Sequence, residues 1–357
     1  MKRPTEAVLT TTHMVFILNT LCLLLVVPEV LFAQAKRRVF VFTDINIDAG
    51  DPDDRQSLVH LLWYANELDI EGIVPERWDA RSIEACDLAL DAYQRDYEEY
   101  KFRKKGYPEA RELRNVVAND TAHVLDLFKQ AASDRTSPLY VLVWGNLLTF
   151  NRALYQFPEL SDNIRLLTIG TGLMMERDIP YLPDSWPKMN QPCEQYNWNG
   201  FGRNRLYDDP RFRQLWWIEM NWTYAGMFSG EDPAEMFDSL SEFGSLGRHI
   251  KEVVKNEPWA QYFRVGDTPS VLYIVDASHD VDKPTESSWA GKFAQPFPSL
   301  RPSYYTDFSD TLAWNYADPC LSWGLHEEVS QVAKSTLESR RGEMYEALIR
   351  KLDQAYR

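Results

Sequence analysis

The sequence predicts an α/β fold with a mostly parallel central sheet and helices on both faces. Three observations favour this fold: short apolar runs recur, longer segments with helical spacing separate them, and each run is continuous rather than alternating. RVFVF at residues 38–42 and PLYVLVWG at residues 138–145 show the pattern. Continuous apolar runs are typical of parallel strands that helices cover on both faces.

The expected elements follow this alternation along the chain. The apolar runs expected as strands are 38–42, 69–74, 138–145, 163–172, 215–222 and 270–277. The segments expected as helices are 53–68, 81–103, 121–132, 149–157 and 326–356. The stretches expected as loops are 174–214, which is long enough to be functional or to cover a site, and 284–302.

The first expected helix has a clear apolar face. Leu58, Leu61, Leu62 and Ala65 recur at helical spacing, and His60 is expected at the surface of the same helix. The last helix, residues 326–356, is highly charged and is expected to pack on the outside of the domain.

Residues 1–35 are interpreted as a signal peptide. Lys2 and Arg3 precede the apolar run VFILNTLCLLLVV, and the small residues Ala33–Ala35 suit signal peptidase. A retained N-terminal anchor is the alternative, although the apolar run is short for a membrane span. Cleavage would leave residues 36–357 as a single domain with a helical tail, secreted or periplasmic and without a membrane contact. Nothing in the sequence decides whether it forms a homo-oligomer.

Charge and cysteine spacing exclude some function classes. The formal net charge of −15 argues against nucleic-acid binding, which requires a basic surface. Cys86, Cys193 and Cys320 remain after signal cleavage, and they lack the paired spacing of a zinc site. One disulfide and isolated buried thiols remain alternatives.

An unusual concentration of acidic residues follows the first expected strand. The stretch TDINIDAGDPDD contains five aspartates within twelve residues: Asp44, Asp48, Asp51, Asp53 and Asp54. Carboxylates at the start of a helix cap backbone N–H groups, and this accounts for one or two of them. Several carboxylates around one turn also suit a hard cation such as Ca²⁺. Both interpretations stay open on the residues alone.

A family resemblance favours the cation. VFTDINIDAGDPDDRQSLVHLL resembles the N-terminal signature of the nucleoside hydrolase superfamily, and more closely the nucleoside hydrolase-like family that includes exported cellulose-binding proteins. LYVLVWGNLLTFNRAL, VGDTPSVLYIV and WAGKF resemble the later motifs of that family, in the same order. The resemblance covers most of residues 38–320 and implies the fold, a calcium site and hydrolysis of a nucleoside or another small glycoside.

The resemblance also implies site residues. It assigns Ca²⁺ ligands to Asp44, Asp53, Asp54, a backbone carbonyl near Leu148 or Thr149, and Asp267. Asp44 would also accept the proton of the attacking water in a reaction with an oxocarbenium-like transition state. For Asp267 the alternative is a turn residue before Pro269.

The expected substrate contacts come from two other segments. Glu194, with Asn197 or Asn199 in CEQYNWNGFG, could hold sugar hydroxyls, or the segment is only a polar loop. Trp144 could stack on a sugar or base, although a place in the aromatic core is the commoner role. The expected partner is therefore a small glycoside, a nucleoside or a saccharide.

Departures from the family pattern weaken the acid half of the site. Phe42 replaces the first aspartate of the motif, the inserted NIDAG lengthens the turn, and Gly266 replaces the histidine often assigned to leaving-group protonation. His279 and Glu286 are candidate acids, with solvated loop residues as the alternative. These departures favour a second hypothesis, a carbohydrate-binding protein with the same cleft and no efficient turnover.

Overall fold

The computed structural model describes residues 36–48, 52–77, 79–171, 201–255, 262–307 and 326–357. Residues 36–357 cluster as one compact unit. The predicted signal peptide lies outside the described residues. Within the described ranges, no helix is long and apolar enough to cross a membrane.

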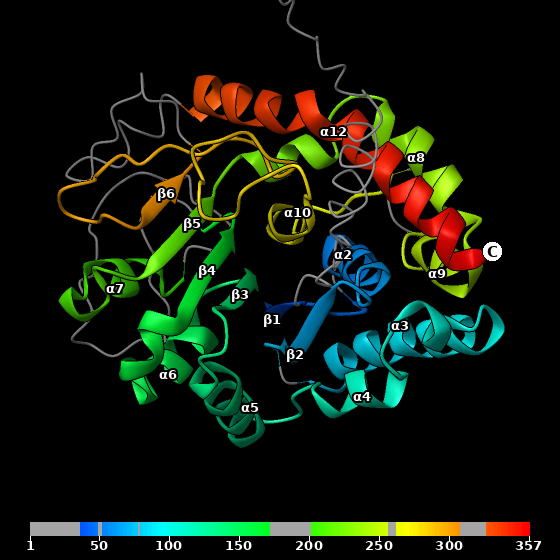
Figure 1. Cartoon of the computed structure of the whole chain (residues 1–357), viewed down its shortest axis with the longest axis horizontal. Helices are drawn as coiled ribbons and strands as arrows, with labels where there is room; N and C mark the ends of the chain where they lie inside the picture. Colours follow the sequence, from blue (N-terminus) through cyan, green and yellow to red (C-terminus); the bar gives the residue numbers. More distant parts are fainter. Residues whose placement is uncertain (1–35, 49–51, 78, 172–200, 256–261, 308–325) are drawn as a thin grey trace, which may run out of the picture. The chain divides into compact units, whose positions relative to one another are not determined.

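A six-stranded parallel sheet forms the centre of this unit (Figure 1). Its strands are β1 (Arg37–Thr43), β2 (Leu68–Pro75), β3 (Leu139–Trp144), β4 (Ile164–Ile169), β5 (Trp216–Met220) and β6 (Tyr304–Thr306). They lie in the order β2-β1-β3-β4-β5-β6, and every neighbouring pair is parallel. The predicted fold class is therefore confirmed.

Helices cover both faces of the sheet (Figure 1). The α-helices described are α2 (Asp53–Trp63), α3 (Ala80–Glu99), α4 (Ala110–Asn115), α5 (Thr121–Ser133), α6 (Leu148–Gln156), α7 (Arg203–Asp208), α8 (Asp232–Ser241), α9 (Gly244–Glu252), α10 (Pro269–Val275) and α12 (His326–Tyr356). Strand alternation in β1 divides the core: Val39 and Val41 pack with α2, α3 and α10, whereas Phe40 and Phe42 pack with α5 and α6.

One sequence prediction about this fold is wrong. Residues 270–277 form helix α10 and its C-cap rather than a strand. Pro269 fits the first turn of a helix, and all seven residues of α10 are buried, so its apolar run cannot be told from a buried strand by periodicity. The sixth strand is instead Tyr304–Thr306, whose three residues are too short to give a periodic signal.

The prediction for His60 is also wrong, because its side chain is fully buried. Its ring lies against Trp63, Tyr64 and Phe263. Burial lowers the pKa of His60 to about 3, so the ring is neutral at physiological pH. The sequence suggested an exposed face on α2, but every residue from Asp54 to Trp63 is buried.

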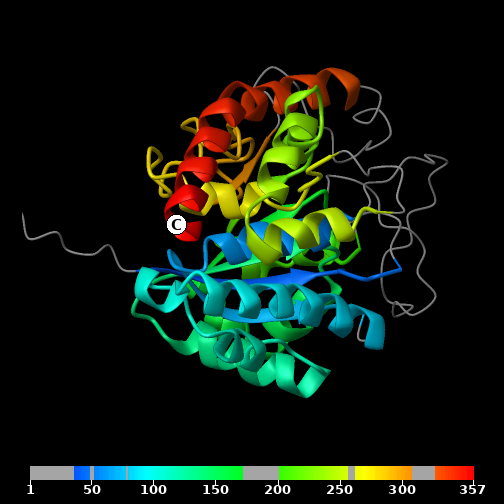
Figure 2. The ribbon, with the colours of Figure 1, turned by 90° about the vertical axis from the view of Figure 1, so that its right-hand side faces the viewer.

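The C-terminal helix α12 is tied to α3 and α9 through one buried carboxylate. Asp96 in α3 accepts hydrogen bonds from the backbone N–H of Ser245 at 2.5 Å and of Leu246 at 2.9 Å, at the start of α9. The hydroxyl of Tyr356 also donates to Asp96, at 2.7 Å. Figure 2 shows α12, in red, running past the yellow-green helices α8 and α9. Asp96 thus joins three helices that lie far apart in the sequence.

We expect Tyr356→Phe to lower the free energy of unfolding by about 1–3 kcal/mol. The substitution removes a donor to buried Asp96 and the acceptor of the Trp63 indole N–H, which lies 3.2 Å from the hydroxyl. Urea unfolding measures the change. Tyr97→Phe is the matched control, because the Tyr97 hydroxyl makes no hydrogen bond to the residues described; equal losses in the two variants would contradict the proposed role of Asp96.

Candidate functional site

Polar residues follow the strands at one edge of the sheet. Because all six strands are parallel, their carboxyl ends meet at this edge, which is where α/β sheets bind ligands. The residues that follow β1 to β6 within two positions include Asp44, Glu76, Asn146, Thr171, Asn221 and Asp307. The edge therefore brings together side chains from segments far apart in the sequence.

The turn between β1 and α2 is fixed by a threonine. The Thr43 hydroxyl donates a hydrogen bond to Asp54, and its oxygen accepts the backbone N–H of Ile45 at 3.1 Å. Pro52 is the N-cap of α2, and no side chain of the described residues caps this helix. Asp53 and Asp54 lie in the first turn instead, so helix capping does not account for the Asp54 carboxylate, which turns back towards β1.

Three carboxylates converge beside this turn. Asp53, Asp54 and Asp267 each offer an oxygen within 4.8 Å of the others. Asp267 is 3% exposed and Asp54 is 8% exposed. Burial raises the pKa of Asp54 well above its usual range, and the negative charges of Asp267, Asp44 and Asp53 raise it further. Such a set of oxygen donors fits a hard cation such as Ca²⁺, which offsets their repulsion.

Asp44 lies next to this carboxylate group but outside it. Its side chain, 32% exposed, forms an ion pair with Arg77 at 3.6 Å. Asp48, in the inserted turn, is exposed and pairs with Arg81 at 2.9 Å. Asp51 lies outside the described residues. The five aspartates of the motif therefore have different environments, and Asp53 and Asp54 are the two that join the cluster with Asp267.

Glu76 is an acidic residue at this edge that the sequence reasoning missed. It directly follows β2 and is 9% exposed, and both of its carboxylate oxygens are buried. Burial raises the pKa of Glu76 well above its usual range, and the negative charge of Asp44 raises it further, whereas hydrogen bonding from the side chain of Thr149 lowers it. The sequence signal that could have identified Glu76 was its place two residues after the expected strand 69–74.

Gly266, at the position of the missing histidine, lies against Asp53. A Cβ atom built on Gly266 would lie 2.8 Å from the nearer Asp53 oxygen, and 3.5 Å and 3.7 Å from the rings of Phe228 and Tyr224. Burial, followed by the charge of Asp53, raises the pKa of Tyr224 to about 12, so its hydroxyl stays protonated. A side chain at position 266 would therefore displace the Asp53 carboxylate.

Of the predicted substrate-contacting residues, the structure describes Trp144. Trp144 is 1% exposed and donates its indole N–H to the Ser270 hydroxyl at 2.8 Å, which places it in the core. Glu194, Asn197 and Asn199 lie outside the described residues.

The two candidate acids lie beyond α10. His279 is buried against the ring of Tyr273, past the end of the helix whose start follows Asp267. Glu286 is exposed, with Lys283 at 3.5 Å. The described contacts of these two residues are therefore with their own loop and α10, and they do not include the carboxylate cluster.

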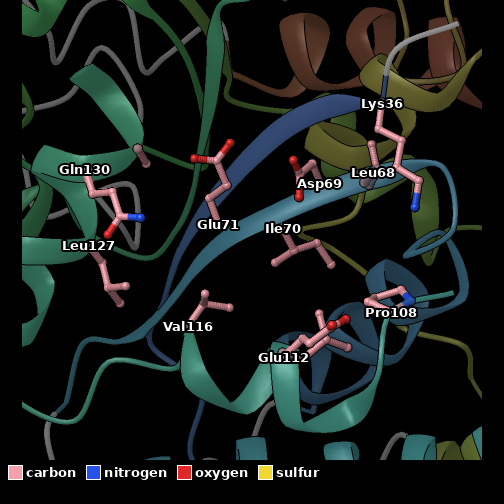
Figure 3. Close-up of a pocket in the computed structure, with 12 residues that line it drawn as sticks. Lys36, Leu68, Asp69, Ile70, Glu71, Pro108, Glu112, Val116, Leu127 and Gln130 are labelled. Carbon is pink, nitrogen blue, oxygen red and sulfur yellow. The ribbon is translucent and has the colours of Figure 1, made fainter. Parts of the chain in front are cut away.

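A cavity of about 320 Å³ lies elsewhere, beside the first residues of β2. Figure 3 shows Asp69 and Glu71 of β2 on one side of it and Leu127 and Gln130 of α5 on another. The cavity lies at the opposite end of β2 from Glu76. None of the predicted site residues lines it, so the candidate site rests on the carboxylate cluster alone.

Comparisons with known proteins identify the family of this chain and a solved structure with a similar fold. The family model described as "Cellulose-binding Sde182, nucleoside hydrolase-like domain" matches residues 38–293. The chain belongs to this family. A nucleoside hydrolase-related protein of Saccharophagus degradans, described as associated with carbohydrate metabolism, has a similar structure, with a TM-score of 0.57 and 17% identity over 90% of this chain and 72% of that one.

Other matched structures belong to the wider nucleoside hydrolase group. The inosine-uridine preferring nucleoside hydrolase of Bacillus anthracis has a TM-score of 0.42 and 15% identity over 84% of this chain and 99% of that one. The purine-preferring ribonucleoside hydrolase of Gardnerella vaginalis has a TM-score of 0.41 and 12% identity, with the same shares covered. No curated protein matches the sequence. The predicted family resemblance is confirmed.

Asp307, after β6, gives this edge a pH-dependent stability. Its carboxylate accepts the backbone N–H groups of Trp222 and Thr223 at 2.5 Å and 2.7 Å. Burial nevertheless raises its pKa to about 6. The folded protein thus holds a proton on Asp307 that the unfolded chain has already released, so the stability gained is present below about pH 4 and lost as the pH rises through about 6.

We expect Asp307→Asn to reduce this pH dependence. The free energy of unfolding of the wild type, minus that of the variant, should be roughly 2–3 kcal/mol larger near pH 4 than near pH 7.5. Urea unfolding at the two pH values measures it. The same difference at both pH values, or a larger one at pH 7.5, would show that Asp307 does not bind this proton.

Proposed function

We propose that this protein is an exported, calcium-dependent hydrolase of N-glycosidic or related glycosidic bonds, acting on a nucleoside-like or small glycoside substrate. The observation that carries the proposal is the group of Asp53, Asp54 and Asp267, whose oxygens lie within 4.8 Å of one another at the carboxyl edge of the sheet. Family membership supports a nucleoside hydrolase-like site at this edge. Export would follow from cleavage of residues 1–35.

The chain provides residues for the metal and water half of such a reaction. Asp53, Asp54 and Asp267 would hold the cation, and the Thr43 hydroxyl fixes Asp54 for this purpose. Bound Ca²⁺ would supply positive charge that favours binding of sugar hydroxyls and ionisation of the attacking water. Asp44 is partly exposed beside the cluster and would accept the proton of that water, with Arg77 holding the orientation of its carboxylate.

The second candidate is a carbohydrate-binding protein with little or no turnover. The observation that favours it is Gly266, which lies against Asp53 and provides no side chain that could protonate a leaving group. The cellulose-binding description of the family supports the same candidate. Both candidates use one cleft and one cation, so calcium binding and turnover must be measured separately.

Calcium should stabilise the wild type, and Asp54→Asn should remove most of this effect. At a Ca²⁺ concentration of about 100 times the dissociation constant, the wild type should gain about 2.7 kcal/mol, seen as a rise in Tm. Asp48→Asn is the matched control from the same turn, because Asp48 is exposed and paired with Arg81. A Tm that does not respond to Ca²⁺ in any variant would contradict both candidate functions.

Turnover should depend on both the cation and Asp44. We expect the mature protein to hydrolyse a nitrophenyl riboside or a nucleoside, to lose this activity in a chelator, and to lose about 10²–10⁴-fold in kcat with Asp44→Ala. Product release is followed by absorbance, with cello-oligosaccharides tested in parallel. Calcium-dependent binding of a saccharide without product from any substrate would overturn the hydrolase and support the binding protein.

A further inference from the structure

Strand β2 is an edge strand of the sheet, and its outer side is only partly paired. Ile73 donates its backbone N–H to the carbonyl of Val116 and accepts the N–H of Ala118, both at 2.8 Å, so Val117 lies beside it as a short parallel partner. Among the residues that the structure describes, none forms such a backbone hydrogen bond with Asp69–Glu71 on the side away from β1. Free main-chain groups on an edge strand are a template for pairing with another extended chain.

The cavity of about 320 Å³ lies along this unpaired part of β2 (Figure 3). The buried side chains that line it are all apolar: Leu68, Ile70, Leu113 and Ala131. Asp69, Glu112 and Gln130 also line it and are exposed, so the cavity has a polar rim. Val116 both lines the cavity and pairs with Ile73, so the cavity continues from the partner segment towards the start of β2. This is the place that a further strand would occupy.

The charge around the cavity favours a basic partner. Glu71 is compensated by Arg38, whose Nη2 lies 2.8 Å from Glu71 Oε2, and the ammonium group of Lys36 donates to a backbone carbonyl at 3.0 Å. Asp69 and Glu112 form no salt bridge with a residue in the described ranges, so their negative charge is in excess. A second copy of this chain would bring its own Asp69 to the same edge, and like charges on facing strands repel.

We propose that this cavity binds an extended segment of another protein, with lysine or arginine at alternate positions between apolar residues, as an added strand beside β2. Its backbone would pair with residues 69–71. Because alternate side chains of a strand point to opposite faces, its apolar side chains would lie against Leu113 and Val116, and its basic side chains would meet Asp69, with Glu112 adding to the attraction. Three residues of a strand span about 10 Å, so the recognised core is short and the interaction is of the transient class.

The added strand is independent of the proposed hydrolase. The cavity lies at the opposite end of β2 from Glu76, and Asp53, Asp54 and Asp267 do not line it. Peptide binding should therefore be unchanged when Ca²⁺ is removed by a chelator. Its failure would leave the proposed function untouched, and a protein without a calcium response would still be able to bind the peptide.

Two labelled hexapeptides, blocked at both ends, test the charge requirement. One alternates lysine with valine, and the other has glutamate in place of lysine, so the two share their valines and their backbone. By fluorescence anisotropy at about 0.15 M salt, the mature protein should bind the lysine peptide with a dissociation constant of roughly 10 μM to 1 mM, and the glutamate peptide at least about 10-fold more weakly. Equal affinities, or no binding of either peptide, would overturn the proposal.

Hydrogen exchange of the wild type tests the backbone pairing. With the lysine peptide bound, the amides in residues 68–72 that face away from β1 should exchange at least about 3-fold more slowly, because each becomes hydrogen-bonded. Helix α9 does not line the cavity, and its exchange should not change. Peptide binding without slower exchange in residues 68–72 would show that charge alone holds the peptide, and it would overturn the added strand.

Two substitutions locate the contact. Asp69→Lys should weaken the lysine peptide at least about 10-fold and favour the glutamate peptide instead. Glu112→Gln should weaken the lysine peptide about 2–5-fold, and it keeps the capping box of α4, since glutamine serves at that position as well. The matched control is Asp208→Lys, an exposed residue at the end of α7 that does not line the cavity, and it should stay within about 2-fold of the wild type.

The remaining outcomes are also decisive. An Asp69→Lys variant that binds the lysine peptide as the wild type does would overturn the proposal. So would sedimentation that shows the protein alone to be a dimer that Asp69→Lys dissociates or strengthens, because the edge would then belong to a second copy. Should Asp69→Lys fail to fold, the comparison of the two peptides and the hydrogen exchange still decide, since both use the wild type.

Discussion

Negative charge gathered at the carboxyl edge of the sheet is the constraint on which the candidate site depends. Parallel strands end at one edge, so residues that follow them meet there, and in this chain several of those residues are acidic. The hydrogen bond from Thr43 to Asp54 joins the last residue of β1 to the first turn of α2, and it thereby holds Asp54 near Asp44. Their proximity is a property of the fold, and a cation is the simplest group that offsets the repulsion.

The surrounding core keeps this arrangement rigid. Helix α2 is buried along nearly its whole length, so Asp53 and Asp54 stand on an element that cannot shift without disturbing α3, α9 and α10. Rigid support of this kind lowers the reorganisation needed when a ligand binds. The same burial makes α2 poorly amphipathic, and for this reason its pattern misled the prediction that His60 is exposed.

Much of the fold could be predicted from the sequence, because β1 to β5 are apolar runs with helices between them. What the sequence could not show were features decided by tertiary packing: α10 is apolar on all sides, and β6 is only three residues long. The site divides in the same way. Asp53, Asp54 and Asp267 could be assigned from a motif, whereas Glu76 stands alone after β2, and only the strand order places it beside Asp44.

Two glycines show how this edge differs from one built for acid catalysis. Gly266 and Gly145 each bring backbone to a position where a Cβ atom would lie 2.8 Å from a carboxylate oxygen, of Asp53 and of Glu76 respectively. A side chain that protonates a leaving group is absent at the first, and the Glu76 carboxyl fills the position of a side chain at the second. Groups that bind a sugar in its ground state lower the dissociation constant without raising kcat. Whether Asp44 acts as a base therefore decides between turnover and binding at this edge of the sheet.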